Sequence, residues 1–353
     1  MTRVPRLVDV VIAPPAHRVD QAAAVDFARD TFGNAFRDLN RLLPLFTHAG
    51  ISTRHFCVPP EWFRAEHSFA EKNLIYIQSA TELCTRAGRE LLEKTGRQPA
   101  DIDRVIFINT TGLATPSIDA RLINLLGLRL DTRRTPLWGL GCAGGAAGLA
   151  HAFHHLVGHP RERVLLFAAE MCSLTFLRGD TSKSNLVATA LFADGAAAAL
   201  ISGDETGDPG FELLDARSTL YPDSLDVMGW NVVEAGLQVV FNRRIPTIVE
   251  THAAGELDAF LGAHGLDRAA LTQLLIHPGG AKVLEAYAKA YGRPVSDFPF
   301  STGVLRDFGN MSSVTVLYVL QRYLAAHRPG RGGHALITAL GPGFSSESLL
   351  MRV

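Results

Sequence analysis

Short apolar runs along the chain alternate with helix-like stretches. Four of these runs are rich in β-branched and large aliphatic residues and end in glycine or polar residues, at 104–112, 163–170, 271–280 and 333–343. Their nearly continuous apolar character predicts strands that are buried on both faces, as in a layered α/β protein.

Helices are predicted between and after these strands. The helix-like segments lie at 67–96, at 117–128, from Ala143 onward and at 311–327. Ser312 and Ser313 stand near the start of the last segment, where their hydroxyl groups are plausible helix caps.

One polar stretch divides the chain. Residues 202–210, SGDETGDPG, are rich in Gly, Asp and Pro, which is typical of a linker, although a surface hairpin loop would look similar. We place a boundary there and expect two halves, residues 1–210 and 211–353. A chain of 353 residues has room for two core-bearing units of ordinary size.

Composition and charge narrow the class of protein. Hydrophobic residues make up 47% of the chain and charged residues 20%, as in compact folded proteins. The formal net charge is −1, so no overall positive field favours nucleic acid or an anionic membrane. No apolar stretch approaches the roughly 20 residues that span a bilayer. Pro14 and Pro15 break the first apolar run too early for a secretory signal, and four cysteines suggest a reducing compartment, so we expect a cytoplasmic protein.

Cys142 differs from the other three cysteines because glycines flank it. In PLWGLGCAGGAAGLA, a short apolar stretch ends at this cysteine, and the glycines allow a sharp turn and close approach of a substrate. The sulfur is expected near the N-terminus of the helix that follows, where the helix dipole favours a thiolate. The pattern predicts a nucleophile. The alternative is a structural cysteine buried on a packed glycine-rich helix.

Two later segments offer partners for a thiolate. His277 lies in LLIHPGG, at the end of a strand-like run where proline and glycine force a turn. Asn310 lies in RDFGNMSS, between a glycine and a helix. The ends of buried strands and the starts of helices are where α/β enzymes collect reactive groups. Taken alone, either residue could also be a turn residue without a chemical role.

Metal binding is not expected. The chain has no CxxC or HExxH pattern, and its four cysteines are dispersed, so no zinc-ligand spacing arises. His151, His154, His155 and His159 are interpreted as helix-face or loop residues. The segment GCAGGAAG also lacks the GK[ST] ending of a Walker loop.

Five segments together resemble those of one enzyme family. WGLGCAGGAAGL, IHPGG and FGNMSS occur in this order and are similar to the Cys, His and Asn motifs of the type III polyketide synthases, the chalcone synthase-like branch of the thiolase fold. ALFADGAAAALISG (190–203) and ALGPGFSSE (339–347) resemble two further segments of that family. The resemblance runs from about Asp9 to the C-terminus. It implies a layered α/β/α/β/α fold built from two βαβαβ-type halves.

The resemblance also implies an acyltransferase with a Cys–His–Asn site. Cys142 would take an acyl group from a coenzyme A thioester, and His277 would stabilise the thiolate as an ion pair. Malonyl-CoA would then lose carbon dioxide, while His277 and the Asn310 amide stabilise the charge on the thioester oxygen. The resulting carbanion equivalent would attack the acyl-cysteine. No cofactor is expected, because the coenzyme A thioesters are substrates.

Further positions match residues that shape the family's cavity. Phe192 corresponds to the first of two phenylalanines that narrow the passage from the coenzyme A tunnel, whereas the second is replaced by Val239. This departure suggests a wider or more aliphatic passage. The other matching positions are Thr110, Thr115, Cys172, Thr175 and the loop formed by Gly341, Pro342 and Gly343.

Basic residues at the tunnel mouth bind coenzyme A in this family. Lys282, just after HPGG, matches one of them, and Arg54 is a second candidate, for which a solvated surface role is the alternative. The family is homodimeric, and the segment around Thr115 and Pro116 is expected near the subunit contact.

The segments HAGISTRHF, WGLGCAGG and GLQVVF look most like those of bacterial and fungal synthases that extend long-chain acyl starters. We therefore hypothesise a fatty acyl-CoA starter and alkylpyrone or alkylresorcinol products. The alternatives are a synthase with a short or aromatic starter, a ketoacyl synthase III that uses carrier-bound malonate, and a non-catalytic thiolase-fold subunit. A papain-like hydrolase shares the order Cys, His, Asn but has its cysteine near the mature N-terminus.

Overall fold

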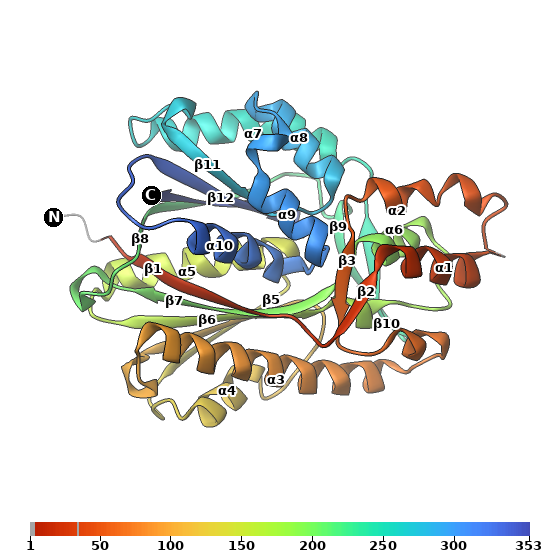
Figure 1. Cartoon of the computed structure of the whole chain (residues 1–353), viewed down its shortest axis with the longest axis horizontal. Coiled ribbons are helices and arrows are strands. Elements are labelled where there is room, and N and C mark those ends of the chain that lie inside the picture. The colour runs from red at the N-terminus through yellow and green to blue at the C-terminus, as the bar shows by residue number, and fades with distance from the viewer. Residues whose placement is uncertain (1–3, 34) are drawn as a thin grey trace.

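One mixed sheet of nine strands runs through the molecule (Figure 1) in the computed structural model, which describes residues 4–33 and 35–353. From one edge to the other, the strands are β11 (Leu271–Ile276), β12 (His334–Gly341), β13 (Ser345–Arg352), β8 (Phe211–Leu220), β1 (Arg6–Ala13), β7 (Asp194–Ser202), β6 (Arg163–Met171), β4 (Arg104–Asn109) and β5 (Arg133–Trp138). The four runs predicted as strands form β4, β6, β11 and β12. All residues but the first are buried in β4, β6 and β12, so the prediction of strands covered on both faces is confirmed there, whereas β11, at the edge of the sheet, leaves Thr272 exposed.

Four strands in each half of the sheet repeat the same order and directions, and β5 is an additional strand at one edge. β7 is antiparallel to β1 and β6, and β6 is parallel to β4. In the other half, β13 is antiparallel to β8 and β12, and β12 is parallel to β11. The halves join where Arg6 and Leu7 pair with Glu212 and Phe211. The expected linker, 202–210, connects β7 to β8, and the division into two separate domains stays a prediction.

Helices pack on this sheet in three layers (Figure 1). They are α3 (Phe69–Thr95), α4 (Ile118–Leu126), α5 (Gly144–Gly158), α7 (Ile245–Gly262), α8 (Ala281–Tyr291) and α10 (Thr315–Ala326). α3 and α4 cover the half with β4 and β6, α7 and α8 cover the half with β11 and β12, and α5 and α10 lie between the halves. The resulting order of helix, sheet, helix, sheet, helix confirms the expected thiolase-like fold.

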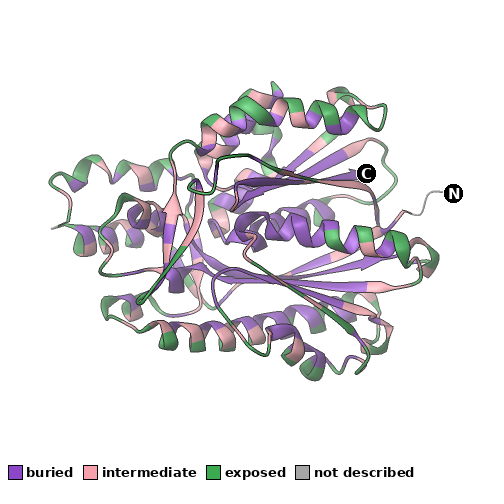
Figure 2. Ribbon diagram, turned by 180° about the vertical axis from the view of Figure 1, so that it is seen from behind, coloured by how far each residue is buried: buried purple, intermediate pink, exposed green. Residues whose placement is uncertain are grey.

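The central layer is the most enclosed part of the molecule. Its apolar core joins α5 and α10 to the inner faces of both sheet halves, and Figure 2 shows α5 buried along most of its N-terminal part. The two helices approach closely because α5 is rich in glycine there. A Cβ on Gly145 would lie 2.2 Å from the carbonyl oxygen of Ser313, ahead of α10. The N-terminal ends of both inner helices are therefore fixed against each other.

Smaller elements gather at one side of the sheet (Figure 1). They are β2 (His17–Asp20), α1 (Gln21–Phe32), α2 (Pro44–His48), β3 (Thr53–Phe56), α6 (Lys183–Leu191), β9 (Met228–Val233) and β10 (Gly236–Phe241), while α9 (Pro299–Phe308) precedes α10. β2 pairs with β3, β9 pairs with β10, and α1, α2 and α6 share an apolar cluster. None of the helices in the described part of the chain is long and apolar enough to cross a membrane.

The four predicted helices are present as α3, α4, α5 and α10, but the predicted caps of α10 are wrong. This helix begins at Thr315, and Val314 holds the cap position without a side-chain hydrogen bond. Ser312 and Ser313 lie in a short 3-10 turn before it. The Ser313 hydroxyl donates instead to the buried carboxylate of Glu170 at 2.6 Å. These hydroxyls therefore point into the protein core, where they bind other buried groups.

Candidate active site

Cys142 lies in the tight turn that leads into α5. Residues Gly141–Ala143 form a single 3-10 turn, and the φ of Gly141 is +47°, a conformation that favours glycine. A Cβ on Gly141 would also come within 2.4 Å of Pro342 Cδ, in the loop between β12 and β13. The glycine thus permits both the turn and the close packing of that loop. Cys142 itself is buried but not fully enclosed, at 6% exposure.

Asn310 lies two residues before the 3-10 turn that leads into α10, whereas Cys142 lies within the 3-10 turn that leads into α5. Its N–H donates to the Leu191 carbonyl and its carbonyl accepts from the Ala193 N–H, both at 2.9 Å. In the side chain, Nδ2 donates to the Gly279 carbonyl at 3.1 Å and Oδ1 accepts from the Ser312 N–H at 2.8 Å. The amide is therefore oriented at both ends, and one end binds the loop that follows β11.

His277 is the first residue after β11. Its N–H donates to the Thr338 carbonyl on β12 at 2.8 Å, and the residue is 3% exposed. Within the described residues, neither ring nitrogen has a hydrogen-bond partner. Buried polar atoms are usually paired, so this imidazole stands ready for a substrate atom or a proton.

Cys142, Asn310 and His277 come from three different elements of the fold. The side chains of Ser312 and Asn310 lie near enough to the Cys142 thiol to lower its pKa. The Asn310 amide in turn binds the carbonyl of Gly279, two residues after His277. The start of α5, the start of α10 and the end of β11 thus supply one site.

Burial disfavours an isolated charge on either of two groups in this site. It raises the pKa of the Cys142 thiol to about 12, with hydrogen bonds from Ser312 and Asn310 acting in the opposite direction. It lowers the pKa of His277 to about 3. A thiolate here therefore needs a compensating cation, and a proton moved from Cys142 to His277 would create both charges at once.

Two residues near Cys142, Ser312 and Glu170, were not among the predicted site residues. Ser312 has a φ of +50°, rare for a residue other than glycine and often found at functional sites. Glu170, at the end of β6, accepts hydrogen bonds from the N–H groups of Thr110 and Thr111 at 3.0 Å and from the Thr111 hydroxyl at 2.7 Å. Burial raises the pKa of Glu170 to about 7, and its charge raises the pKa of the nearby thiol.

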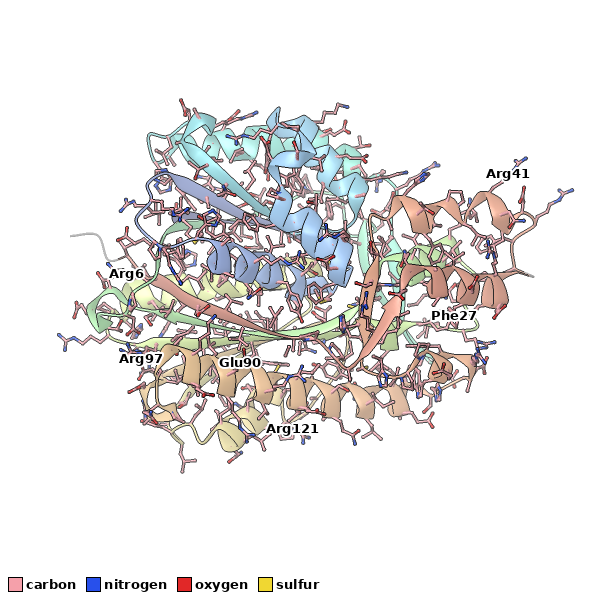
Figure 3. All side chains as sticks on the ribbon, in the orientation of Figure 1. Arg6, Phe27, Arg41, Glu90, Arg97 and Arg121 are labelled. Atoms are coloured by element: carbon pink, nitrogen blue, oxygen red, sulfur yellow. The ribbon has the colours of Figure 1, made fainter. Side chains whose placement is uncertain are left out.

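A pocket lies beside this group and is lined mainly by apolar side chains. Phe192 forms a backbone bridge with Asn310, and it lines the pocket with Cys172, Thr175 and Val239. The free space around these residues is about 660 Å³ when the solvent at the open mouth is counted, and the cavity itself is about 80 Å³. Its other apolar residues are Val19, Ala23, Ala24, Phe27 (labelled in Figure 3), Phe56, Pro60, Phe63, Phe176 and Ala188.

Two aromatic residues that were not predicted as cavity residues pack against Phe192 at the pocket. The ring centres of Trp230 and Phe241 lie 5.9 and 5.4 Å from that of Phe192. Trp230 is directly opposite Val239 in the β9–β10 ribbon. Only this strand register brings them to the pocket, so no local motif could have indicated them.

The other predicted cavity residues lie outside this pocket lining. The Thr110 hydroxyl accepts from the Gly141 N–H at 3.0 Å, under the turn that carries Cys142. Gly341 and Gly343 flank Pro342 in the loop that packs on the same turn. Thr115 is exposed on the surface of the chain.

Of the two residues predicted to bind coenzyme A, one is exposed and the other is buried. Lys282 is exposed on the first turn of α8, five residues after His277, as a residue at a tunnel mouth would be. Arg54 is only 1% exposed, and its guanidinium donates to the backbone carbonyls of Thr189 and Phe192. The alternative of a solvated surface role for Arg54 is therefore wrong, because the side chain is buried, while its contact with coenzyme A stays a prediction.

One group of side chains has the spacing of a metal site. Within the described chain, His155, His159 and Glu162 each offer one ligand atom within 4.8 Å of the others. They lie at the end of α5 opposite Cys142, and Arg133 already pairs with Glu162 at 2.6 Å. The sequence-based expectation of no metal stays a prediction.

Comparisons with known proteins agree with this geometry. The family models for the N-terminal and C-terminal domains of chalcone and stilbene synthases match residues 7–205 and 212–353. A protein named putative chalcone synthase from Bacillus subtilis (strain 168) is 43% identical, over 95% of each chain. A 1,3,6,8-tetrahydroxynaphthalene synthase from Streptomyces peucetius subsp. caesius is 39% identical, over 96% of this chain and 91% of that protein.

A solved structure has the same fold over almost the whole chain. The crystal structure of 1,3,6,8-tetrahydroxynaphthalene synthase from Streptomyces coelicolor A3(2), a bacterial type III polyketide synthase, superimposes with a TM-score of 0.92 and 29% identity. The match covers 98% of this chain and 99% of that one. With both family models matched in order, this chain belongs to the chalcone and stilbene synthase family and is a type III polyketide synthase, an acyltransferase that uses coenzyme A thioesters.

Proposed function

We propose that this synthase condenses a long-chain fatty acyl-CoA starter with malonyl-CoA to give alkylpyrones or alkylresorcinols. The observation that carries the proposal is the apolar pocket. Phe192 and Cys172 line its end nearest to Cys142, His277 and Asn310, and Phe192 forms a backbone bridge with Asn310. Each CH₂ group moved from water into such a pocket contributes roughly 0.8 kcal/mol. The pocket would therefore favour a long alkyl chain over a short one.

Cys142 is the proposed nucleophile. Its proton moves to His277, the sulfur attacks the thioester carbonyl of the starter, and the bond to the coenzyme A sulfur breaks. The imidazolium offsets the thiolate charge during the attack, and it then protonates the departing coenzyme A thiolate. This transfer leaves His277 neutral, the form that its burial favours.

His277 and Asn310 are the proposed donors in the next step. The bond between the malonyl carboxylate and C2 breaks, carbon dioxide leaves, and the electron pair forms an enolate with charge on the thioester oxygen. Asn310 Nδ2 uses one of its two protons for the Gly279 carbonyl, so the other can donate to that oxygen, as can an N–H of His277. The enolate carbon attacks the acyl carbon, the bond to Cys142 breaks, and the freed thiolate takes up a proton.

Two further roles follow from position. We propose that Lys282 binds coenzyme A phosphates, because it is exposed on α8 close after His277.

We also propose that the chain forms a homodimer through the edge of the sheet at β5. β5 is the last strand of the sheet, and Trp138 and Leu113 beside it are 49% and 43% exposed. An open sheet edge with exposed apolar residues is a surface that proteins usually cover.

The relatives provide the main alternative. Several of the similar proteins are named 1,3,6,8-tetrahydroxynaphthalene synthases, after a product without an alkyl chain, so a synthase with a short or aromatic starter competes with the long-chain proposal. A ketoacyl synthase III-like reaction, with malonate on a carrier protein, is the other alternative.

The starter is tested by product mass spectrometry with acyl-CoAs of graded length and malonyl-CoA. We expect kcat/KM to rise with chain length and the products to carry the alkyl chain. Cys142→Ala should give no product, whereas Cys84→Ala, a buried cysteine on α3, should act as the wild type. Turnover of short or aromatic starters alone would contradict the long-chain proposal, and a requirement for carrier-bound malonate would favour the ketoacyl synthase reaction.

A further inference from the structure

Arg54 lies on β3 with its charged end inside the protein. Nη1 donates to the carbonyls of Thr189 at 2.7 Å and Phe192 at 2.9 Å. The guanidinium carbon lies 5.4 Å from the centre of the Phe56 ring. Because both carbonyls belong to one short segment, residues 189–193, the guanidinium holds this segment at two points.

The segment 189–193 is also the one that fixes Asn310. Both the N–H and the carbonyl of Asn310 bond to the backbone of this segment, each at 2.9 Å. Arg54 meets the neighbouring residue as well, since a Cβ on Gly309 would lie 2.9 Å from Arg54 Cγ. The aliphatic stem of Arg54 thus packs against the residue before Asn310, and its guanidinium binds the segment to which the Asn310 backbone is hydrogen-bonded.

Burial lowers the pKa of Arg54 to about 10, and Asp194, which follows this segment, is the opposite charge that acts against this shift. Its fully buried carboxylate accepts from the N–H and hydroxyl of Ser173 at 2.7 and 2.6 Å and from the Cys57 N–H at 2.8 Å. Arg54 therefore connects β3 to the segment 189–193, and Asp194 connects that segment to the turn at Ser173, which lines the pocket. A guanidinium can serve two acceptors in fixed directions, which a lysine ammonium does not reproduce.

We propose that Arg54 is a positioning residue for the decarboxylation and condensation step. It acts through residues 189–193, which place the Asn310 amide against the loop after His277. Cys142 is carried by a different element, the turn before α5, so transfer of the starter to Cys142 depends less on Arg54. This inference rests on the proposed function of Cys142, His277 and Asn310.

The test compares Arg54→Lys with Arg163→Lys as a matched control. Arg163 is also largely buried and binds a buried carboxylate, that of Asp208, but it lies at the start of β6, away from the site. For each variant, mass spectrometry would follow acylation of Cys142 by an acyl-CoA, and carbon dioxide release would follow malonyl-CoA decarboxylation. The thermal midpoint would report the loss of stability.

We expect Arg54→Lys to acylate Cys142 within about twofold of the wild-type rate and to lose at least tenfold in decarboxylation, about 1.4 kcal/mol in activation free energy. Arg163→Lys should lose stability without separating the two rates. If Arg54→Lys does not fold, the double variant Arg54→Gln/Asp194→Asn, which leaves no buried charge unpaired, must show the same separation. Absence of the separation in both variants would overturn the inference. A wild-type protein that decarboxylates no malonyl-CoA would instead contradict the proposed function.

Discussion

At the scale of single residues, the site is built from groups that are buried before any substrate arrives. Burial alone would leave Cys142 as a thiol and His277 as a neutral imidazole at neutral pH. Each group can carry charge only if the other compensates it. The chemistry therefore belongs to the pair, and removal of either member should change how the other titrates.

Replacement of His277 by Gln tests this coupling. Without a proton acceptor, the Cys142 thiol keeps a pKa raised to about 12 by burial. Its reaction with iodoacetamide should then be slower than in the wild type at pH 7 and should rise about tenfold per pH unit up to pH 10, because only the thiolate reacts. The wild type should show a much flatter profile. Equal rates and equal profiles in the two proteins would show that His277 does not activate the thiol.

Glu170 gives a prediction about stability. Its folded-state pKa of about 7 lies above the ordinary value of 4.5, so this group stabilises the fold most below pH 4.5 and loses that contribution as pH rises through 7. At about 1.4 kcal/mol per pKa unit, the loss is about 3 kcal/mol. Between pH 4.5 and 7.5, the free energy of unfolding should fall by this amount more in the wild type than in Glu170→Gln. Denaturant titrations at a series of pH values measure the difference, and parallel curves would refute it.

At the scale of elements, the two inner helices must approach closely for the site to form. Gly145→Ala would place a Cβ 2.2 Å from the Ser313 carbonyl and so push α5 from the turn before α10. Overpacking of this kind costs about 1–3 kcal/mol, and it should also lower condensation because Ser313 is three residues from Asn310. Gly158→Ala is the matched control, since a Cβ at this last residue of α5 meets no atom within 4 Å. Equal thermal midpoints and activities for the two variants would contradict the packing argument.

Which site residues could be predicted from the sequence depends on whether their contacts lie within one element or between elements far apart in the chain. Cys142, His277 and Asn310 stand in short motifs next to a strand or helix end, so local pattern was enough to locate them. Glu170 is different because its bond to Ser313 spans 143 residues, and no local pattern encodes that contact. Arg54 was placed at the surface for the same reason, since the carbonyls it binds lie 135 and 138 residues away.

At the scale of the whole molecule, the predicted layers were recovered because nearly all-apolar runs bounded by glycine or polar residues are typical of strands covered on both faces. The family resemblance implied the repeat between the two halves, but hydrophobic patterning alone could not, because the repeat is carried by strand pairing. It explains the site nonetheless. The repeat places α5 and α10 in equivalent positions, so Cys142 and Asn310 meet at their N-terminal ends.

The proposed dimer belongs to this scale. Light scattering should give twice the chain mass of 38.2 kDa for the wild type. Leu113→Asp, which would put a charge beside the edge strand β5, should raise the dimer dissociation constant at least tenfold, or about 1.4 kcal/mol. Leu225→Asp is the matched control, at an 85% exposed leucine between β8 and β9. A monomeric wild type, or identical behaviour of the two variants, would rule out this interface.

The most direct test of the whole mechanism is the mass of the acyl-enzyme. The protein is mixed with a long-chain acyl-CoA alone, digested, and the peptide that contains Cys142 is identified by tandem mass spectrometry. We predict the intact acyl group on Cys142 in the wild type and in Asn310→Ala, and its release as a chain extended by two carbons on addition of malonyl-CoA to the wild type only. An acyl group on another residue, or equal extension by Asn310→Ala, would contradict the assignment of the nucleophile or of the decarboxylation site.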